Sequence, residues 1–215
     1  MRRPMVAGNW KMNGSQSEAA ALLEGIGQGL AAVKQAEVVV CPPFILIPAV
    51  ATRLKGSRIA WGGQNLNVNK SGAFTGEVSG PMLKDFGCTY VIVGHSERRA
   101  LYGETDQMVA EKFKAAQDVG LVPILCVGET LGEREANATD AVVARQLDAV
   151  LALTGIGSLT HAVVAYEPVW AIGTGKTATP EMAADAHRAI RALVAGKFGA
   201  AAAQQVRILY GGSVK

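Results

Sequence analysis

Short apolar runs alternate along the chain with longer segments rich in alanine and in helix-forming polar residues. Most of these runs are almost continuously apolar, which is typical of strands that are buried on both faces. Seven runs are therefore predicted as strands: Met5–Asn9, Glu37–Cys41, Arg58–Gly62, Tyr90–Val93, Val122–Val127, Ala162–Tyr166 and Gln205–Tyr210.

Helices are predicted in the longer segments between these runs. The four clearest are Ser17–Val33, Thr105–Val119, Thr139–Leu153 and Pro180–Lys197. Residues typical of helix starts precede or open them, namely Ser15 and Ser17, Thr105, and the run Thr179-Pro180-Glu181. Regular alternation of strand and helix indicates a parallel sheet whose strands are joined by helical crossovers.

Polar side chains stand just past the carboxyl ends of many predicted strands. They are Asn9, Lys11, Gln64, Asn65, His95, Glu129, Glu167 and Ser213. An open sheet gathers its ligands at one switch point, whereas a barrel draws them from strands all around one rim. The pattern favours an α/β fold of the parallel (β/α) barrel type, with residues 1–215 as a single domain.

Composition excludes several classes of protein. The chain has 215 residues, of which 49% are hydrophobic. Its net charge is +3 and its basic residues are not clustered, so the sequence does not indicate a nucleic-acid partner. The small positive net charge of the chain suits small anionic substrates. The chain has three cysteines, Cys41, Cys88 and Cys126. Their spacing matches neither a metal site nor a disulfide framework, so we expect reduced thiols and a cytoplasmic protein. No run is long enough to span a membrane.

The segment from Val164 to Ala178 carries the clearest chemistry. It places the carboxylate of Glu167 at a strand end, against Pro168 and before a glycine-rich stretch. A carboxylate joined to a mobile loop loses its water when the loop closes and becomes a stronger base. The stretch is therefore interpreted as a proton-abstracting base in the hinge of a lid.

A phosphate-binding P-loop is the alternative interpretation of this segment. Gly175-Lys176-Thr177 matches the end of that motif, but the motif needs a glycine five residues before Gly175. Trp170 occupies that position, and its indole cannot make the tight turn.

His95 follows a predicted strand, and Ser96-Glu97 opens a helix behind it. The positive end of a helix dipole disfavours the imidazolium form, so a neutral ring is expected there. A neutral imidazole can donate a hydrogen bond to a carbonyl oxygen. The other histidines, His161 and His187, lack such a setting.

Four motifs, taken in order, resemble the triosephosphate isomerase family from one end of the chain to the other. They are Gly8-Asn-Trp-Lys-Met-Asn13, Val93-Gly-His-Ser-Glu-Arg-Arg99, Ala165 to Ala178, and Tyr210-Gly-Gly-Ser-Val214. The resemblance implies interconversion of dihydroxyacetone phosphate and D-glyceraldehyde 3-phosphate through an enediolate. It implies Glu167 as the base, His95 as the electrophile and Lys11 as the stabilising cation, with no metal and no organic cofactor.

Further roles follow from the same resemblance. Asn9 is expected to orient the substrate and to hold the Lys11 side chain, and Glu97 to pair with Lys11. The phosphate is expected to meet the backbone of Gly173 in the lid, of Ser213, and of the pair Gly211 and Gly212. The polar segment Gln64–Gly76 is expected to enter a neighbouring subunit, with Thr75 near that subunit's active site, so that a homodimer is implied.

The predicted strands number seven, whereas the family's chain continues to roughly 250 residues with an eighth strand and a last helix. We therefore expect an incomplete barrel that lacks the C-terminal strand and helix. Two functions stay open at this point. One is an isomerase that the missing part impairs, and the other is a catalytically weak or silent barrel that acts mainly as a self-assembling scaffold.

Overall fold

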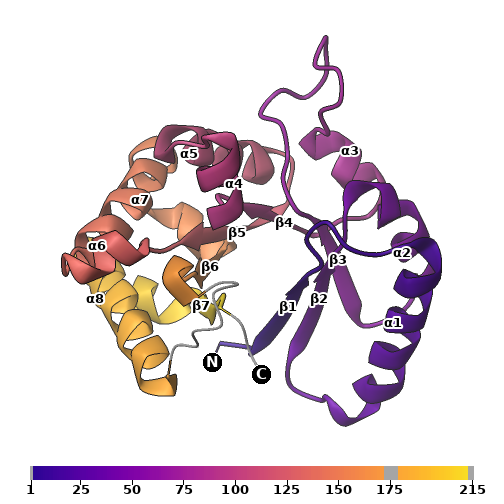
Figure 1. Cartoon of the computed structure of the whole chain (residues 1–215), viewed down its shortest axis with the longest axis horizontal. Coiled ribbons are helices and arrows are strands. Elements are labelled where there is room, and N and C mark those ends of the chain that lie inside the picture. Colours follow the sequence, from indigo (N-terminus) through magenta and orange to yellow (C-terminus); the bar gives the residue numbers. More distant parts are fainter. Residues whose placement is uncertain (1, 172–178, 213–215) are drawn as a thin grey trace. The chain divides into compact units, whose positions relative to one another are not determined.

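The computed structural model describes residues 2–171 and 179–212 of the chain. Within these ranges it has seven parallel strands that follow one another in the sheet in chain order (Figure 1). They are β1 Met5–Asn9, β2 Glu37–Cys41, β3 Ile59–Gly63, β4 Tyr90–Val93, β5 Val122–Val127, β6 Val163–Tyr166 and β7 Arg207–Tyr210. Parallel strands in chain order, joined by helices, are typical of the TIM-type (β/α) barrel. The predicted α/β fold class is thus confirmed.

The crossovers contain eight α-helices in the described part of the chain. They are α1 Gln16–Gly29, α2 Ile47–Leu54, α3 Gly80–Asp85, α4 Ser96–Tyr102, α5 Asp106–Asp118, α6 Leu131–Glu135, α7 Thr139–Thr154 and α8 Pro180–Gln205. Short 3₁₀ helices cover η1 Leu30–Ala32, η2 Phe44–Leu46, η3 Ile156–His161 and η4 Val169–Ala171. Among the described residues, no helix is both long enough and apolar enough to cross a membrane.

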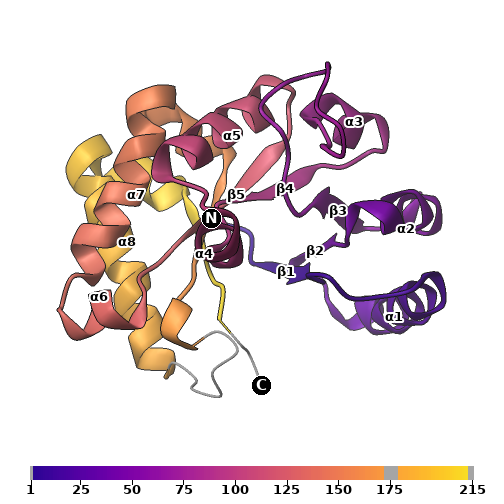
Figure 2. The ribbon, with the colours of Figure 1, turned by 45° about the horizontal axis from the view of Figure 1, so that its top comes forward.

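One compact unit consists of Arg3–Ile92 and Ala115–Pro123. Its helices α1 and α2 lie on the same side of β1, β2 and β3 (Figure 2). A buried cluster joins them to the strands through Leu23, Val40, Val50, Leu54 and Ile59. A long loop, residues 64–79, follows β3 and extends beyond α3 (Figure 1).

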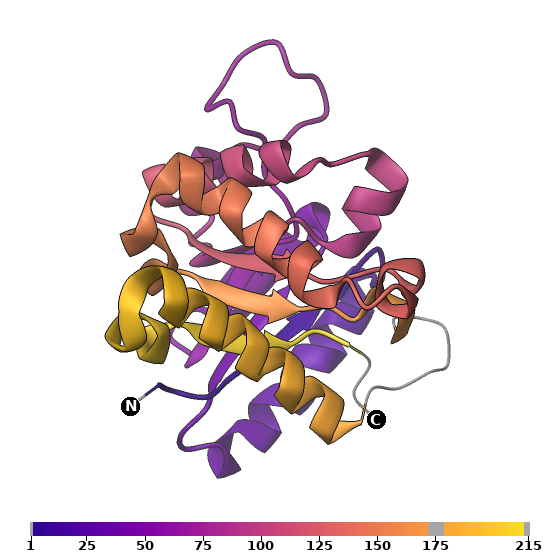
Figure 3. The same ribbon diagram turned by 90° about the vertical axis from the view of Figure 1, so that its left-hand side faces the viewer.

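The second unit contains Arg2, Val93–Lys114 and the chain from Ile124 onward. In it α7 and α8 lie side by side along β6 and β7 (Figure 3). All four residues of β6 are buried, while the four residues of β7 are half-buried. The register pairs Ile124 of β5 with Val163 of β6, which in turn pairs with Arg207 of β7. This register sets the carboxyl ends of the three strands next to one another.

The start signals in the sequence have the predicted local effect. Ser15 is the N-cap of α1, and it forms a capping box with Glu18. Thr179 caps α8 by accepting the N–H of Met182, and proline follows at the first helical position. The predicted helix Pro180–Lys197 is longer in the structure, where it continues through a kink at Gly199 to Gln205.

Candidate active site

His95 stands where β4 gives way to α4. Gly94 makes the turn with a φ of 71°, in the left-handed region that favours glycine. His95 is the N-cap of α4, and its Nδ1 atom accepts the N–H of Glu97 at 3.2 Å. Because this hydrogen bond makes Nδ1 an acceptor, the network assigns a neutral ring with its proton on Nε2.

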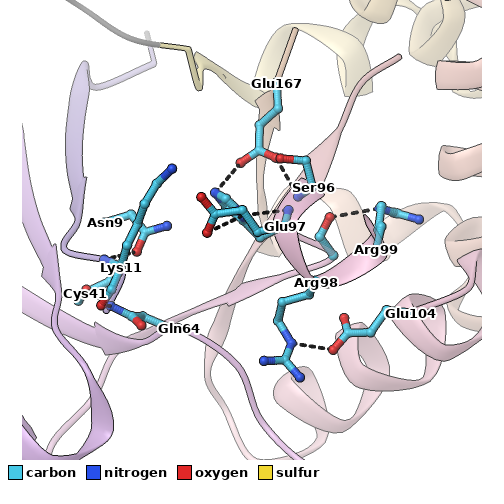
Figure 4. A network of polar contacts seen from close by, with 12 residues as sticks. Asn9, Lys11, Cys41, Gln64, Ser96, Glu97, Arg98, Arg99, Glu104 and Glu167 are labelled. Atoms are coloured by element: carbon cyan, nitrogen blue, oxygen red, sulfur yellow. Dashed lines mark hydrogen bonds and ion pairs between the residues drawn. The ribbon is translucent and has the colours of Figure 1, made fainter. Parts of the chain in front are cut away.

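Glu167 follows β6 directly, and only 4% of the residue is exposed. Its N–H donates to the carbonyl of Val127 at 2.7 Å, which fixes the residue to the end of β5. Its Oε1 atom lies 3.1 Å from Nε2 of His95, and its Oε2 atom accepts the N–H of Ser96 at 2.9 Å (Figure 4). The residues predicted as base and electrophile are thus in direct contact.

Two glycines make room for Glu167. A Cβ atom on Gly128 would lie 1.8 Å from the carbonyl oxygen of Glu167, and one on Gly211 would lie 2.9 Å from its Cγ. Buried Gln146 holds Gly128 by accepting its N–H at 2.8 Å and donating to its carbonyl at 3.1 Å. Gly128 and Gln146 are not among the residues predicted from the sequence. The position of Gly128 directly after a predicted strand was the available signal.

In the other unit, Lys11 follows β1 with a φ of 53°, which a non-glycine residue adopts only under strain. Its N–H donates to Oδ1 of Asn9 at 3.0 Å, and its carbonyl accepts Nε2 of Gln64 at 2.9 Å. The same Gln64 nitrogen donates to the carbonyl of Cys41 at 2.9 Å (Figure 4). Residues at the ends of β1, β2 and β3 thus fix the Lys11 backbone. The hydrogen bond of Asn9 given above joins its side chain to the main chain of Lys11.

A buried carboxylate, Glu129, ties the chain after Glu167 to the end of β5. The hydroxyl of Tyr166 donates to Glu129 Oε1 at 2.9 Å, and Nε1 of Trp170 donates to the same oxygen at 3.0 Å. Arg134 lies 3.3 Å from Oε1 and stacks 4.4 Å from the Trp170 ring. Burial, and next the charge of Glu129, raise the pKa of Tyr166. These contacts hold η4, the segment from which the predicted lid departs.

Glu167 also lines a cavity of about 420 Å³ within its own unit. Arg99 forms part of the wall, where it donates to the carbonyl of Gly94 at 2.9 Å and pairs with Asp106 at 2.6 Å. Arg145 pairs with the second oxygen of Asp106 at 2.9 Å. A volume of this size suits a small ligand, and both of these arginines are paired with the same aspartate in the wall.

The predicted phosphate-binding residues are only partly described. Residues 172–178 lie outside the described residues, and they include Gly173 and all of the predicted lid (171–175) except Ala171. Ser213 lies outside the described residues as well. Gly211 donates its N–H to the carbonyl of Tyr166 at 2.7 Å, so that this amide extends the β6·β7 ladder. Gly212 follows it and is half-buried.

Comparison with known proteins agrees with the resemblance seen in the sequence. A profile of the triosephosphate isomerase family matches residues 4–215. Over all 215 residues the chain is 60% identical to the triosephosphate isomerase of Thiobacillus denitrificans and covers 85% of that protein. It is 59% identical to that of Dechloromonas aromatica and 57% identical to that of Nitrosococcus oceani, and it covers 86% of each. The chain therefore belongs to the triosephosphate isomerase family.

Proposed function

We propose that the chain interconverts dihydroxyacetone phosphate and D-glyceraldehyde 3-phosphate, with Glu167 as the base and His95 as the electrophile. Membership of the family supports the activity. The observation that carries the residue roles is the 3.1 Å contact between Oε1 of Glu167 and Nε2 of His95. Proton transfer beside a carbonyl requires a base, which can be a carboxylate, and is assisted by a hydrogen-bond donor to the oxygen that becomes negative.

The proton and electron balance is simple. Glu167 removes a proton from the carbon next to the carbonyl, and the electrons of that C–H bond form the double bond of the enediolate. Nε2–H of His95 donates to the oxygen that gains negative charge, and the ring shuttles a proton between the two neighbouring oxygens. Glu167 then returns its proton to the adjacent carbon. Atoms and electrons balance within the substrate, so the step needs no oxidant, reductant or co-substrate, and the proposal includes neither a metal nor an organic cofactor.

Lys11 supplies the positive charge in this proposal. An ammonium group favours both the substrate phosphate and the oxygen that becomes negative in the enediolate. The strained backbone of Lys11, held by Asn9 and Gln64, supports a fixed direction for the side chain. In addition, Asn9 orients the substrate and Glu97 pairs with Lys11.

The phosphate of the substrate meets backbone groups in this proposal. The N–H groups of Gly173 and Ser213 donate to it, and Gly211 and Gly212 allow the backbone to approach closely. The role of Gly211 is close approach, since its N–H is already used in the β6·β7 ladder. Closure of the lid at residues 171–175 protects the enediolate phosphate from elimination.

A coupled assay of the purified protein tests the proposed function. The conversion of D-glyceraldehyde 3-phosphate is followed through an auxiliary dehydrogenase, with mass spectrometry to verify the chain and light scattering to measure its assembly state. Turnover that disappears in Lys11→Met would support the isomerase. A well-folded protein that assembles but has no turnover above the Lys11→Met background would instead favour the silent scaffold.

A homodimer is the second part of the proposal. In the first unit the side chains of Met12 and Ile45 are strongly exposed, at 95% and 87%. The loop at residues 64–79 is closed at its base, where the N–H of Asn67 donates to the carbonyl of Val78 at 2.8 Å, and Thr75 is exposed in it. Exposed apolar side chains and a projecting loop suit contact with a second copy.

Light scattering across a wide concentration range tests the dimer. A double variant, Met12→Ser with Ile45→Ser, should lower the measured mass towards that of a single chain. Leu22→Ser, at an exposed position of α1, serves as the matched control. A wild-type protein that has the mass of one chain at every concentration would exclude the dimer.

The state of the cysteines supports a cytoplasmic location. All three are buried free thiols, namely Cys41, Cys88 and Cys126. Burial raises the pKa of Cys41 to about 12 and that of Cys88 to about 11, so both stay protonated and unreactive. Unpaired thiols are typical of proteins in a reducing compartment.

A further inference from the structure

The cavity that Glu167 lines extends beyond the proposed proton-transfer pair. It measures about 420 Å³, and all of its described lining residues belong to the second compact unit. Helices α4, α5, α6 and α7 and the end of β5 contribute to its wall. Four of the lining residues are exposed, which gives the cavity an opening to solvent: Ala100, Thr105, Thr130 and Arg145. Among the described lining residues, only Glu167 takes part in the proposed reaction, so most of this wall has no role in it.

Glu104 contributes a buried oxygen atom without a partner to this cavity. Gly103 ends α4 in the left-handed region with a φ of 67°, and Glu104 follows it with 2% of its side chain exposed. Its Oε1 atom lies 2.5 Å from Nε of Arg98 and 2.5 Å from Nζ of Lys112 (Figure 4). Its Oε2 atom is shielded from solvent and has no hydrogen-bond partner among the described residues. A buried acceptor of this kind has a free-energy cost, which a ligand that donates a hydrogen bond removes.

The charges around the cavity balance one another. The negative charges of the described lining are those of Glu104, Asp106, Glu133 and Glu167. The positive charges are those of two lining residues and of the two partners of Glu104, namely Arg99, Arg145, Arg98 and Lys112. An added ion would therefore have no unpaired counter-charge, and the burial of an unpaired ion is costly. A neutral ligand avoids this cost.

The remaining wall is apolar. It contains the side chains of Ala100, Cys126, Val127 and Val169. We propose that this cavity binds a small neutral molecule of the primary carboxamide class, whose N–H donates to Oε2 of Glu104 while its apolar body packs against these side chains. A volume of this size accommodates such a molecule.

Arg145 provides a donor for the oxygen of the carboxamide. Its Nε donates to Oδ2 of Asp106 at 2.9 Å. A guanidinium carries five N–H donors, so Arg145 retains others for a ligand acceptor. A carboxamide brings a donor and an acceptor together without a charge, which is what Glu104 and Arg145 require.

The ionisation of Glu104 distinguishes an amide from an acid of the same shape. Burial raises the pKa of Glu104, but the hydrogen bonds and positive charges of Lys112 and Arg98 together lower it below its ordinary value. The carboxylate is therefore ionised at neutral pH, and both of its oxygens are acceptors. A carboxylate ligand would place another acceptor against Oε2 and be repelled, whereas an amide donates to it.

Occupation of the cavity should also affect turnover, and this part rests on the proposed function. Glu167 lines the cavity in the position where His95 and Ser96 hold its two oxygens. A ligand shifts an equilibrium towards the form that it contacts better, so a ligand packed against Glu167 favours this position. To remove a proton from the substrate, Glu167 has to leave one of these contacts. The ligand should therefore act as an inhibitor.

Calorimetry on the full chain with three probes of one shape tests the site. Benzamide is neutral, benzamidine is positively charged and benzoate is negatively charged. We expect saturable binding of benzamide that is at least tenfold tighter than the binding of either ion.

Two alanine variants locate the binding. Ala100→Leu fills the opening of the cavity and should weaken benzamide binding at least tenfold. Ala141→Leu, at an exposed position of α7 outside the described lining, is the matched control and should bind like the wild type. Lys11→Met should also retain binding, which separates this cavity from the proposed substrate site.

Glu104→Gln tests the partner of the amide. The change replaces a charged acceptor by a neutral amide, so the preference for benzamide over benzoate should fall at least tenfold. A loss of packing alone would weaken both probes equally and leave the preference unchanged. Since Glu104 is also paired within the fold, the wild-type comparison of the three probes and Ala100→Leu decide the outcome if Glu104→Gln does not fold.

The absence of saturable benzamide binding to the wild type, or equal binding by Ala100→Leu and Ala141→Leu, would overturn the proposed site. Tighter binding of either ion would overturn the assignment to a neutral ligand.

The coupled assay measures the effect on Glu167. Saturating benzamide should lower kcat/KM about fivefold or more in the wild type and have no effect in Ala100→Leu. An unchanged kcat/KM in the wild type at saturation would overturn the effect on Glu167. A wild-type protein without turnover would contradict the proposed function instead, and the calorimetric result would still decide the site.

Discussion

Nε2 of His95 lies 3.1 Å from Oε1 of Glu167, and the N–H of the next residue, Ser96, donates to Oε2 of the same carboxylate at 2.9 Å. One turn at the beginning of α4 thus holds both oxygens of the proposed base (Figure 4). To remove a proton from carbon, Glu167 has to exchange one of these contacts for the substrate. A substitution that shortens the side chain of Glu167 therefore tests its role as the base.

Glu167→Asp keeps the charge but shortens the reach by one methylene group. We expect kcat to fall by about 10²-fold or more, because a displacement of roughly 1 Å is enough to misalign proton transfer. KM should change little, because phosphate binding is assigned to other residues. Steady-state kinetics measure both constants, and Glu135→Asp at the exposed end of α6 is the control. A parallel loss in both constants would mean that Glu167 does not act as the base.

His95→Gln tests the second member of the pair. Glutamine can donate one hydrogen bond but cannot carry a proton between two oxygens, so we expect kcat to fall by about 10²- to 10⁴-fold. The thermal midpoint should stay near that of the wild type, and His161→Gln, in the exposed end of η3, should retain full activity. A variant with normal turnover would remove His95 from the mechanism.

The sequence predicted the strands well because burial on both faces leaves a continuous apolar run. Four of the seven agree residue for residue, among them Tyr90–Val93, which precedes His95. The short helices α2, α3 and α6 were missed. They have eight, six and five residues, too few for a helical period to stand out.

The site was predictable only where chemistry and strand ends coincide. Glu167 and His95 stand at such ends, and each was found from its own neighbours in the chain. Gln146 lies 18 residues from Gly128, and nothing in its local sequence indicates that they bind each other. The protonation of His95 likewise depends on a backbone N–H that only the folded turn of α4 places at Nδ1.

Tyr166→Phe should weaken the attachment of η4 to β5. The change removes a hydroxyl that donates to both oxygens of buried Glu129, at 2.9 and 3.0 Å. A hydrogen bond to a charged group contributes about 1.5–3 kcal/mol, so the free energy of unfolding in urea should fall by about that amount. Tyr102→Phe, at a tyrosine that is 67% exposed, should change it by less than about 0.5 kcal/mol. Equal effects of the two substitutions would contradict a structural role for the buried hydroxyl.

Gly128→Ala should damage both stability and activity. The new methyl group would lie 1.8 Å from the carbonyl oxygen of Glu167, so that one of the two backbones has to move. Overpacking of this kind costs about 1–3 kcal/mol or more, and the shift displaces the proposed base. Urea unfolding and steady-state kinetics measure the two effects. Gly132→Ala, where a Cβ atom would have no neighbour within 4 Å, is the matched control and should behave like the wild type.

Glu104 should make the stability of the protein depend on acid pH. Its side chain is 2% exposed, and Nε of Arg98 and Nζ of Lys112 both lie 2.5 Å from its Oε1 atom. Burial alone would raise the pKa of Glu104, but the hydrogen bonds and the positive charges of Lys112 and Arg98 together outweigh burial, so that the pKa lies below its ordinary value.

A carboxyl group whose pKa is lower in the folded state stabilises the protein above its unfolded pKa, and this contribution is lost as the pH falls through the folded pKa. The wild type should therefore be more stable than Glu104→Gln at about pH 7, and the difference should shrink below about pH 4. Urea unfolding at a series of pH values measures it, with Glu135→Gln as the exposed control. A difference that stays constant down to about pH 3 would show that the ionised carboxylate of Glu104 is not what stabilises the fold, and that the variant acts through packing alone.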